Sequence, residues 1–489
     1  MKKTLSALIL VLLWGATIAQ VKFFVRLDSA LKGSYTGRLF VETLNDTTKE
    51  FGQGGLGPQA GFAIQVNDWS NKTMQVVDSN ADYTVRAMKA LKPGFYKVAA
   101  VLDINTTERS KHATGNLYSR KEALLEVKKG GTGEVTVTIN SIFKDRPFRE
   151  TVNIRELRFQ STLLSKFHKK PVFIKAAVVL PTAYREDSTR VFPVVYIIPG
   201  WGGTHYDALG PMPAKRYGFT QGLPKIFVYL NPETQSPFGL HGFVDSRVNG
   251  PWGQALVEEL VPHVHRHYRA SDDPQQTFLM GQSTGGYASA WLMMHYPKAF
   301  GGSWGTSPDP VDFTSFIGVN LYQDKNFYVD GKGREREFYK VGGKYLSTIR
   351  SFVREELFHG DGGQQQSFEA EFGRFAADGK PRMLFNRTTG AINREVVELW
   401  KDYDLGAFLL KNWKRLENDL KGKIHLYAGS EDNFYLNESL LAFRNKVLSL
   451  NAELVAEEIP GADHFSLWSP EFINRVHQEM DRKISSSRP

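Results

Sequence analysis

Strand-like and helix-like runs alternate from residue 191 onward, and this rhythm limits the fold more than any other feature of the sequence. The strand-like runs are residues 191–198, 226–230, 277–280, 424–428 and 453–459, and the helix-like runs are 254–268, 286–296 and 437–450. Apolar strands separated by helices are typical of a mostly parallel sheet, because the linking helices must cross its faces and cover them. We therefore expect an α/β architecture in this part of the chain.

A different rhythm precedes residue 144. Between residues 21 and 143, short alternating or apolar runs are separated by polar turns such as Pro93-Gly94, and no convincing helical pattern interrupts them. Such period-two alternation is typical of an antiparallel β-sandwich. We expect an all-β sandwich domain at 20–146 and the α/β domain at 147–489, and the 489-residue length accommodates both.

Residues 1–19 have the layout of a secretory signal peptide. Lys2 and Lys3 form a basic start, residues 5–14 are an apolar run, and Ala19 is a small residue at the expected cleavage position. An apolar run of roughly ten residues is too short to span a bilayer, which takes about 20. We expect cleavage after Ala19 and a periplasmic or secreted protein without a membrane span.

Composition excludes several kinds of chemistry. The chain has no cysteine, so disulfide frameworks, thiol nucleophiles and cysteine-ligated zinc are excluded. Its formal charge of +9 falls to +7 without Lys2 and Lys3, because 59 basic and 52 acidic residues remain. This mild excess favours solubility and at most a bias toward acidic partners, and no local feature supports nucleic-acid binding.

A glycine-flanked serine follows one of the predicted strands. Residues 281–285 read Gly-Gln-Ser-Thr-Gly and lie between the strand-like run 277–280 and a helix-like run. A serine on such a sharp strand-to-helix turn is a nucleophile elbow, and its glycines are required because neighbouring side chains would clash. Ser283 is therefore the candidate nucleophile, and the alternative is a glycine-rich turn without chemistry.

The candidate base is a histidine late in the chain. A serine hydroxyl is a poor nucleophile at neutral pH, so it needs a base, and the base needs an orienting carboxylate. For an elbow of this kind the order along the chain is Ser, then Asp or Glu, then His. His464 follows the last predicted strand, whereas His477 falls on a helical run. We expect His464 to be the base; a structural surface histidine is the alternative.

The candidate acid lies in the loop after the strand-like run 424–428. This loop contains Glu431 and Asp432, and we expect Asp432 to be the acid, with Glu431 as the fallback. The interval from Asp432 to His464 leaves room for one helix and one strand. Asp463, next to the histidine, is expected to cap or brace its loop.

Two backbone N–H groups are needed to hold a developing oxyanion, one from the residue after the nucleophile and one from an early loop. The first would be Thr284. The second would lie in residues 199–203, Pro-Gly-Trp-Gly-Gly, directly after the strand-like run 191–198, and Trp201 is the candidate donor. The alternative for this loop is a plain strand-end turn.

Together these residues resemble the "Putative esterase" family of α/β-hydrolases, which includes esterase D, feruloyl esterases and enterochelin esterases. The resemblance covers roughly residue 152 to the C-terminus, apart from a middle insertion, and implies an α/β-hydrolase fold with the triad Ser283, Asp432 and His464. The family's early loop usually reads His-Gly followed by the oxyanion donor. Here Pro199 replaces that histidine, a departure that concerns how the loop is braced rather than the backbone donor.

Several side chains on the predicted active-site loops are candidate substrate contacts. Residues 245–253, which include Asn249 and Trp252, are similar to the family's loop before the helix beside the active site, although Pro251 and Gly253 could simply start that helix. Tyr435 follows the acid loop. Trp468 follows His464 and could stack on a sugar or phenolic ring; the alternative is that it closes the core.

The interval between nucleophile and acid is longer than a minimal core needs. It spans 149 residues, from 283 to 432, whereas two strand–helix units need on the order of 70. We interpret 311–420 as containing a helical cap over the pocket that excludes water and shapes specificity. The alternative is a peripheral insertion or a dimerisation arm.

The predicted chemistry needs no metal and no cofactor. His263, His265 and His267 end a helical run, and an i, i+4 pair can bind zinc, but no acidic partner is placed to complete the site.

We expect an exported serine carboxylic-ester hydrolase that forms an acyl-enzyme. The resemblance suggests small-molecule or polysaccharide-linked esters, such as plant phenolic or acetyl esters. The alternatives are a siderophore trilactone esterase, an acyltransferase, and a non-catalytic glycan- or protein-binding homologue. A homodimer stays open.

Overall fold

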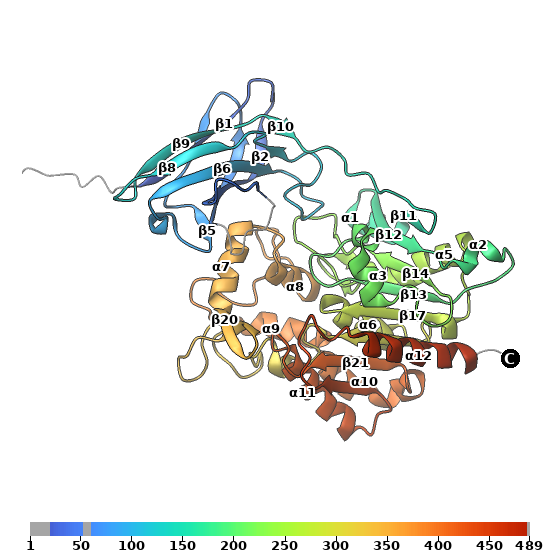
Figure 1. Cartoon of the computed structure of the whole chain (residues 1–489). Helices are drawn as coiled ribbons and strands as arrows, with labels where there is room; N and C mark the ends of the chain where they lie inside the picture. Colours follow the sequence, from blue (N-terminus) through green and yellow to red (C-terminus); the bar gives the residue numbers. More distant parts are fainter. Residues whose placement is uncertain (1–19, 52–59, 487–489) are drawn as a thin grey trace, which may run out of the picture. The chain divides into compact units, whose positions relative to one another are not determined.

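The computed structural model describes residues 20–51 and 60–486, which separate into two compact units (Figure 1). The first contains the described residues up to Ile104 together with Asn116–Phe143. The second contains Asn105–Gly115 and the described residues from Lys144 onward. The predicted signal peptide lies outside the described residues.

Two β-sheets form the first unit. The smaller has the order β4-β1-β9, and the larger has the order β10-β7-β6-β2-β3-β5 with β8 beside β6. The strands are β1 Val21–Leu27, β2 Tyr35–Leu44, β3 Gly61–Trp69, β4 Met74–Val77, β5 Asp82–Thr84, β6 Gly94–Asp103, β7 Leu117–Tyr118, β8 Ala123–Val127, β9 Gly133–Ile139 and β10 Ser141–Ile142, and a 3-10 turn, η1, spans Met88–Ala90. A β-rich N-terminal unit is therefore present, as predicted.

Alternating side chains of both sheets meet in one apolar core. In β1 every second residue is buried, and Phe23 stacks on Phe62 of β3 with ring centroids 5.4 Å apart. The prediction of a purely antiparallel sandwich is wrong at one pair, because β1 and β9 run parallel. Parallel neighbours need a long connection rather than a hairpin, and nearly the whole unit lies between these two strands.

An eight-stranded sheet is the centre of the second unit. Its order is β11-β12-β14-β13-β17-β18-β21-β22, with β11 Ile154–Ser161, β12 Val172–Val179, β13 Val194–Ile198, β14 Ile226–Leu230, β17 Thr277–Gln282, β18 Gly302–Thr306, β21 Ile424–Gly429 and β22 Val455–Ile459. β12 is antiparallel to both of its neighbours. From β14 to β22 each strand is parallel to the next.

Helices cover both faces of this sheet, because its strands are apolar on both sides. Within β13, Tyr196 belongs to the core on one face and Val195 and Ile197 to the core on the other. The first face packs against α1 Thr162–His168, α4 Trp252–Ala255, the π-helical turn η3 Leu256–Leu260, α5 Val261–His267, α6 Thr284–His295, α10 Leu405–Leu420 and α11 Leu436–Ser449; the second packs against α3 Pro211–Tyr217 and α12 Pro470–Ser486. Shorter elements are α2 Ala183–Glu186, η2 His205–Leu209, η4 Pro274–Gln276 and the pair β15 Asp245–Ser246 and β16 Gly250–Pro251.

The long segment between β18 and β21 contains its own small elements. These are η5 Phe313–Ser315, β19 Glu337–Val341, β20 Lys344–Thr348, α7 Ile349–His359, α8 Gln364–Phe372, α9 Arg394–Trp400 and η6 Lys401–Tyr403, followed by α10. Helix α7 begins at Ile349, directly after a hairpin formed by β19 and β20. Gly342 and Gly343 turn a hairpin with positive φ, and the Thr348 hydroxyl caps α7 by accepting a hydrogen bond from Ser351 N–H.

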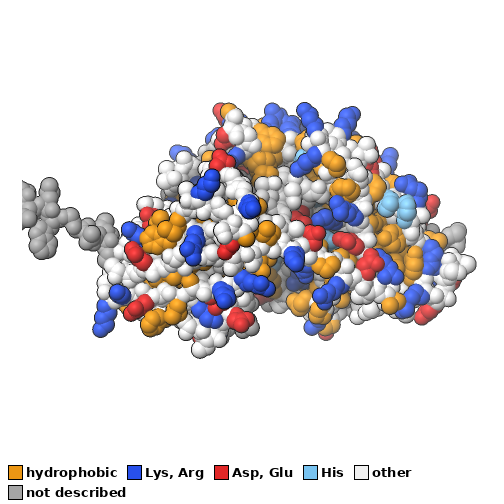
Figure 2. Space-filling model, turned by 90° about the horizontal axis from the view of Figure 1, so that it is seen from above, with side chains coloured by type: hydrophobic (Ala, Val, Ile, Leu, Met, Phe, Trp, Pro, Cys, Tyr) orange, Lys and Arg blue, Asp and Glu red, His pale blue; other side chains and the backbone are white. Residues whose placement is uncertain are grey.

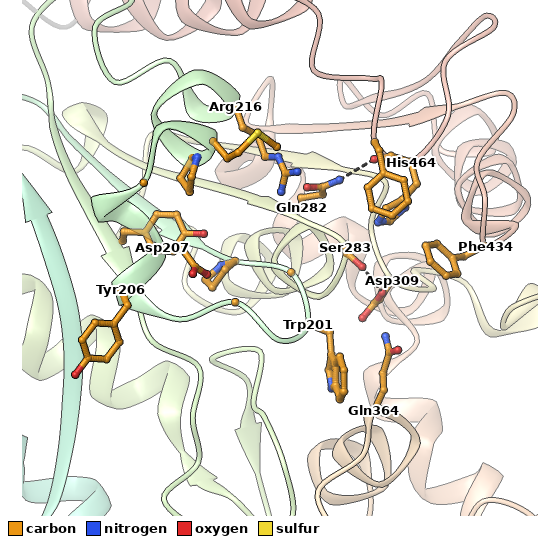
Figure 3. A pocket seen from close by; sticks show the side chains of 18 of the residues that line it. Trp201, Tyr206, Asp207, Arg216, Gln282, Ser283, Asp309, Gln364, Phe434 and His464 are labelled. Atoms are coloured by element: carbon orange, nitrogen blue, oxygen red, sulfur yellow. Dashed lines mark hydrogen bonds between the residues drawn. The ribbon is translucent and has the colours of Figure 1, made fainter. Parts of the chain in front are cut away.

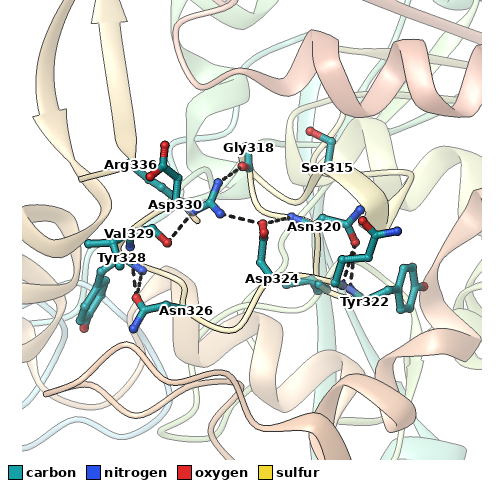
Figure 4. A network of polar contacts seen from close by, with 12 residues as sticks. Ser315, Gly318, Asn320, Tyr322, Asp324, Asn326, Tyr328, Val329, Asp330 and Arg336 are labelled. Carbon is teal, nitrogen blue, oxygen red and sulfur yellow. Dashed lines mark hydrogen bonds and ion pairs between the residues drawn. The ribbon is translucent and has the colours of Figure 1, made fainter. Parts of the chain in front are cut away.

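Polar contacts hold the part of this segment that has no regular structure (Figure 4). The Arg336 guanidinium donates to Asp324 Oδ2 at 2.7 Å and to the Gly318 carbonyl at 2.6 Å. Asp324 Oδ2 also accepts the Asn320 N–H at 2.8 Å, and the Asn326 side-chain oxygen accepts two further backbone N–H groups. These bonds satisfy backbone groups that would otherwise lack partners.

Residues 105–115 lie between strands β6 and β7 of the first unit, but they belong to the second unit. The sequence-based boundary placed them in the sandwich domain, because the strand pattern continues on both sides of them. The structure assigns residues 105–115 to the other unit because of contacts that the sequence does not reveal. One is the ion pair between Glu108 and Lys175 of β12, at 3.3 Å.

Charges of both signs are interspersed over the face shown in Figure 2. Within residues 20–51 and 60–486, no helix is both long and apolar enough to cross a membrane.

Candidate active site

Ser283 lies on a strained turn between β17 and α6. Its backbone has φ 57° and ψ −120°, and its N–H donates to the Thr306 carbonyl at 2.9 Å. The flanking glycines are necessary. A Cβ at Gly285 would lie 1.8 Å from the Ile198 carbonyl oxygen, and one at Gly281 would lie 2.3 Å from the Gly285 carbonyl oxygen. Strain of this kind persists only where surrounding packing enforces it, and it presents the serine side chain at the end of the strand.

A histidine and a carboxylate form a buried pair at the same edge of the sheet. His464 Nδ1 lies 3.0 Å from Asp432 Oδ2, and the Phe434 N–H donates to Asp432 Oδ1 at 2.9 Å. Burial raises the pKa of Asp432, but the hydrogen bond and positive charge of His464 outweigh it, so this pKa lies below its usual value. The carboxylate is therefore ionised and able to orient the imidazole at neutral pH.

Backbone and side-chain bonds fix the His464 loop. The His464 N–H donates to the Asn433 side-chain oxygen at 3.1 Å, and Gln282, the residue before the serine, donates to the His464 carbonyl at 2.7 Å. Asp463 accepts from two following N–H groups, which confirms that it braces the loop. Glu431, the fallback acid, is exposed and faces Lys340 instead.

The two expected oxyanion donors flank the serine. Thr284 is the first residue of α6, so its N–H has no carbonyl partner within the helix. Trp201 follows Gly200, where a Cβ would lie only 3.4 Å from the Ser283 Cβ. The loop after β13 therefore passes directly beside Ser283. Both Trp201 and Ser283 line one pocket.

Asp309 is a site residue that the sequence analysis missed. It follows β18 between two prolines, at the edge where Ser283 lies, and this position after a parallel strand is the signal that could have found it. Ser283 Oγ donates to Asp309 Oδ1 at 3.1 Å, and Thr284 Oγ1 donates to Asp309 Oδ2 at 2.6 Å. In Figure 3 Ser283 and Asp309 point toward each other. Burial raises the pKa of Asp309 more than these hydrogen bonds lower it.

A second buried carboxyl is that of Glu371. Glu371 of α8 accepts the Gly242 N–H at 2.6 Å. Burial, with a further contribution from the charge of Asp309, raises the pKa of Glu371 to about 8. At neutral pH Glu371 is therefore mostly protonated, which avoids an isolated buried charge.

The pocket in front of Ser283 has a volume of about 770 Å³. His464 and Asp309 line it beside the serine. Much of the remaining wall is apolar or aromatic, from Ile317, Phe338, Phe434, Leu436 and Phe465. Besides Asp309, three of the lining residues, Ile317, Phe338 and Gln364, come from the segment between β18 and β21, so that segment contributes to the site.

The four side chains expected to contact substrate do not line this pocket. Trp252 is fully buried, stacks on His241 with ring centroids 3.6 Å apart and donates to the carbonyl of Asn249, which is also buried. Trp468 packs edge-on against Tyr217 in the core beneath the sheet. The Tyr435 hydroxyl donates to Glu337. The prediction of these contacts is corrected, because the side chains point into the fold or along its surface.

The histidine run 263–267 has local partners. His263 and His267 stack at 3.9 Å, and His267 Nδ1 bonds the His263 carbonyl. Among the residues that the structure describes, no three His, Asp or Glu side chains are grouped so as to hold a metal ion.

The raised pKa of Glu371 predicts a pH-dependent stability. A carboxyl whose pKa is about 4.5 when unfolded and about 8 when folded stabilises the native state fully below pH 4.5, and this contribution is lost as the pH rises to 8. Glu371→Gln keeps an acceptor for Gly242 and removes the titration. We expect its melting temperature relative to wild type to rise by about 5 °C between pH 5 and pH 8. Calorimetry at both pH values measures the two melting temperatures, and the exposed Glu398→Gln is the control. A difference in melting temperature between Glu371→Gln and wild type that stays the same at pH 5 and pH 8 would contradict the prediction.

Comparisons with known proteins give structural and family matches. The chain is similar to a ferulic acid esterase at 12% identity, covering 68% of this chain and 98% of that one, with a TM-score of 0.42. It is similar to the fluorophosphonate-binding serine hydrolase FphF of Staphylococcus aureus at 12% identity, covering 67% of this chain and 98% of that one, with a TM-score of 0.43. It is also similar to an S-formylglutathione hydrolase from Agrobacterium tumefaciens at 13% identity, covering 68% of this chain and 97% of that one, with a TM-score of 0.41. No curated protein sequence matches.

The family model described as "Putative esterase" matches residues 172–478. This range includes the elbow serine, the buried carboxylate and its histidine, and it covers more than half of the chain. The protein therefore belongs to this esterase family.

Proposed function

We propose that the protein is a serine hydrolase that cleaves carboxylic esters through Ser283, His464 and Asp432. One observation carries the proposal. A serine on a strained elbow shares a pocket with a histidine whose Nδ1 lies 3.0 Å from a buried, ionised carboxylate. Membership of the esterase family supports the same reaction class.

The chemistry proceeds in two steps. Ser283 Oγ attacks the ester carbonyl while the imidazole of His464 takes the hydroxyl proton, and Asp432 holds the ring in the required tautomer. The N–H groups of Trp201 and Thr284 stabilise the oxyanion. The leaving alcohol receives the proton from His464, and water then attacks the acyl-enzyme by the same route, releasing the acid and free Ser283.

Asp309 determines the resting state in this mechanism. The Ser283 hydroxyl donates to Asp309, so it must turn to His464 before attack. An ionised Asp309 would both compete for that hydroxyl and repel the oxyanion, because like charges a few ångströms apart interact strongly away from water. The raised pKa of Asp309 keeps its proton to a higher pH and weakens both effects.

The pocket walls favour esters with an aromatic acyl or alcohol group, such as phenolic esters. Phe338, Phe434 and Phe465 line the pocket that contains Ser283, and contact between two aromatic rings is more favourable than apolar burial alone. The segment that supplies Phe338 and Gln364 acts as a cap that limits water at the acyl-enzyme. The signal-like N-terminus supports action outside the cytoplasm.

Removing the nucleophile tests the reaction. Ser283→Ala is expected to lower kcat for p-nitrophenyl acetate by at least about 10⁴-fold and to abolish labelling by a fluorophosphonate, because the attacking oxygen is gone. Asp432→Asn is expected to lower kcat by about 10⁴-fold through the wrong imidazole tautomer. The exposed Ser449→Ala is the matched control. Full activity of folded Ser283→Ala would refute the mechanism.

Replacing Asp309 tests its effect on the nucleophile. Asp309→Asn removes the negative charge and leaves a weaker acceptor for Ser283. At alkaline pH, where the Asp309 carboxylate is charged, kcat of the variant should exceed that of wild type by about threefold to tenfold, and this ratio should shrink as falling pH protonates Asp309. Both should converge at acidic pH. The measurement is kcat from pH 5 to 9, and superimposable profiles would rule out this role.

Shortening a pocket wall tests the substrate class. Phe338→Ala should lower kcat/KM for methyl ferulate about tenfold relative to that for p-nitrophenyl acetate, because only the larger aromatic acyl group contacts the lost ring. Phe375→Ala, at an exposed phenylalanine of the same segment that does not line the pocket, is the control. An unchanged ratio would exclude the aromatic wall as the determinant of specificity.

A further inference from the structure

Trp201, the expected oxyanion donor, carries a cation on the face of its ring. The Cζ atom of Arg109 lies 3.7 Å from the centroid of the Trp201 ring. A guanidinium stacked this closely on an indole is attracted by the negative face of the ring and packs flat against it. Trp201 Nε1 is buried without a hydrogen-bond partner within the described residues. Stacking, rather than a bond from the indole nitrogen, therefore holds the ring.

Arg109 also bonds two other segments of the second unit. Its Nε donates to the Gly362 carbonyl at 2.7 Å, and its backbone N–H donates to Glu233 Oε1 at 3.4 Å. Glu233 follows β14. Gly362 lies just before α8, whose first residue, Gln364, lines the pocket. One side chain thus joins the loop after β13 to the segment between β18 and β21.

The loop that carries Arg109 is itself anchored. Glu108 forms an ion pair with Lys175 at 3.3 Å, and the Asn105 side chain donates to the Thr114 carbonyl at 3.0 Å, which closes the base of the loop. These bonds lie on both sides of Arg109. The guanidinium is therefore presented from a fixed backbone rather than from a free chain.

The loop at residues 199–203 needs such a brace because its own residues provide few groups that could hold it in place. Pro199 has no N–H to donate, and it stands where the esterase family usually has a histidine. Gly200 has no side chain, and Gly202 has φ 87°. Trp201 is the one bulky side chain between Pro199 and Gly203, so the position of its ring limits where its backbone N–H points.

We propose that Arg109 is a positioning residue of the esterase site: its guanidinium clamps the Trp201 ring and ties it to the Gly362 backbone, which keeps the Trp201 N–H directed at the oxyanion. The inference rests on the proposed function. It assigns a catalytic contribution to residues 105–115, a loop that leaves β6 and returns to β7 of the β-rich unit. Arg109 touches neither substrate nor Ser283 in this role and acts through Trp201 alone.

Kinetics of Arg109 variants test the proposal. Arg109→Ala should lower kcat for p-nitrophenyl acetate about tenfold with KM changed less than about twofold, because an oxyanion bond acts in the transition state. Arg109→Lys should recover only part of the loss, since an ammonium lacks the planar face. The exposed Arg120→Ala is the control. A purely structural role would instead lower the melting temperature and leave the folded fraction fully active.

A double-mutant cycle separates the clamp from other effects. If Arg109 acts through Trp201, then Arg109→Ala combined with Trp201→Ala should lose no more kcat than Trp201→Ala alone, whereas independent roles would multiply the two losses. Multiplied losses, or wild-type kcat in Arg109→Ala, would overturn the proposal.

Amide hydrogen exchange tests the role of Arg109 independently of whether the proposed ester hydrolysis is correct. In Arg109→Ala the amides of residues 200–204 should exchange faster than in wild type or Arg120→Ala, and this readout needs no substrate. A wild-type protein that neither hydrolyses esters nor labels at Ser283 would refute the reaction but leave the clamp testable. Unchanged exchange at 200–204 in Arg109→Ala would refute the clamp even if the enzyme is active.

Discussion

The approach of α6 to the end of β13 is the constraint on which the site depends. At Gly285 the helix backbone passes so close to the Ile198 carbonyl that a single methyl group would lie 1.8 Å from the oxygen. The same end of β13 continues into Pro199 and Gly200, so one backbone contact restrains both the turn at Ser283 and the loop at residues 199–203. The loops after β21 and β22 reach this edge because parallel strands end together there.

The sequence was sufficient to predict the position of a residue that lies just after the end of a strand. Ser283, Asp432 and His464 each follow an apolar run with a clear pattern, and the structure brings all three to one edge of the sheet. The sequence was insufficient where burial depends on distant partners. Trp252 and Trp468 lie on the expected loops, but His241 and Tyr217 hold them inside the fold. Closeness along the chain does not say which way a ring points.

The same limit explains what was missed. Glu371 is buried because α8 brings it to Gly242, 129 residues earlier in the chain, and no local pattern encodes that approach. Phe338 reaches the pocket from the hairpin of β19 and β20, which the sequence analysis did not predict. In the β-rich unit the strands themselves could be predicted from their alternation. The parallel pairing of β1 with β9 could not, because register between distant strands is a property of the closed core.

The placement of residues 105–115 has a consequence for the order in which the chain acquires its structure during synthesis. Proteins emerge from the ribosome N-terminus first, and domains generally fold as units in that order. The two sheets of the first unit are complete once β10 has been made, but Glu108 and Arg109 must wait for Lys175, Trp201 and finally Gly362. The bonds within this early-made loop can form at once, but the contacts that fix it to the second unit are complete only after residue 362 has been translated.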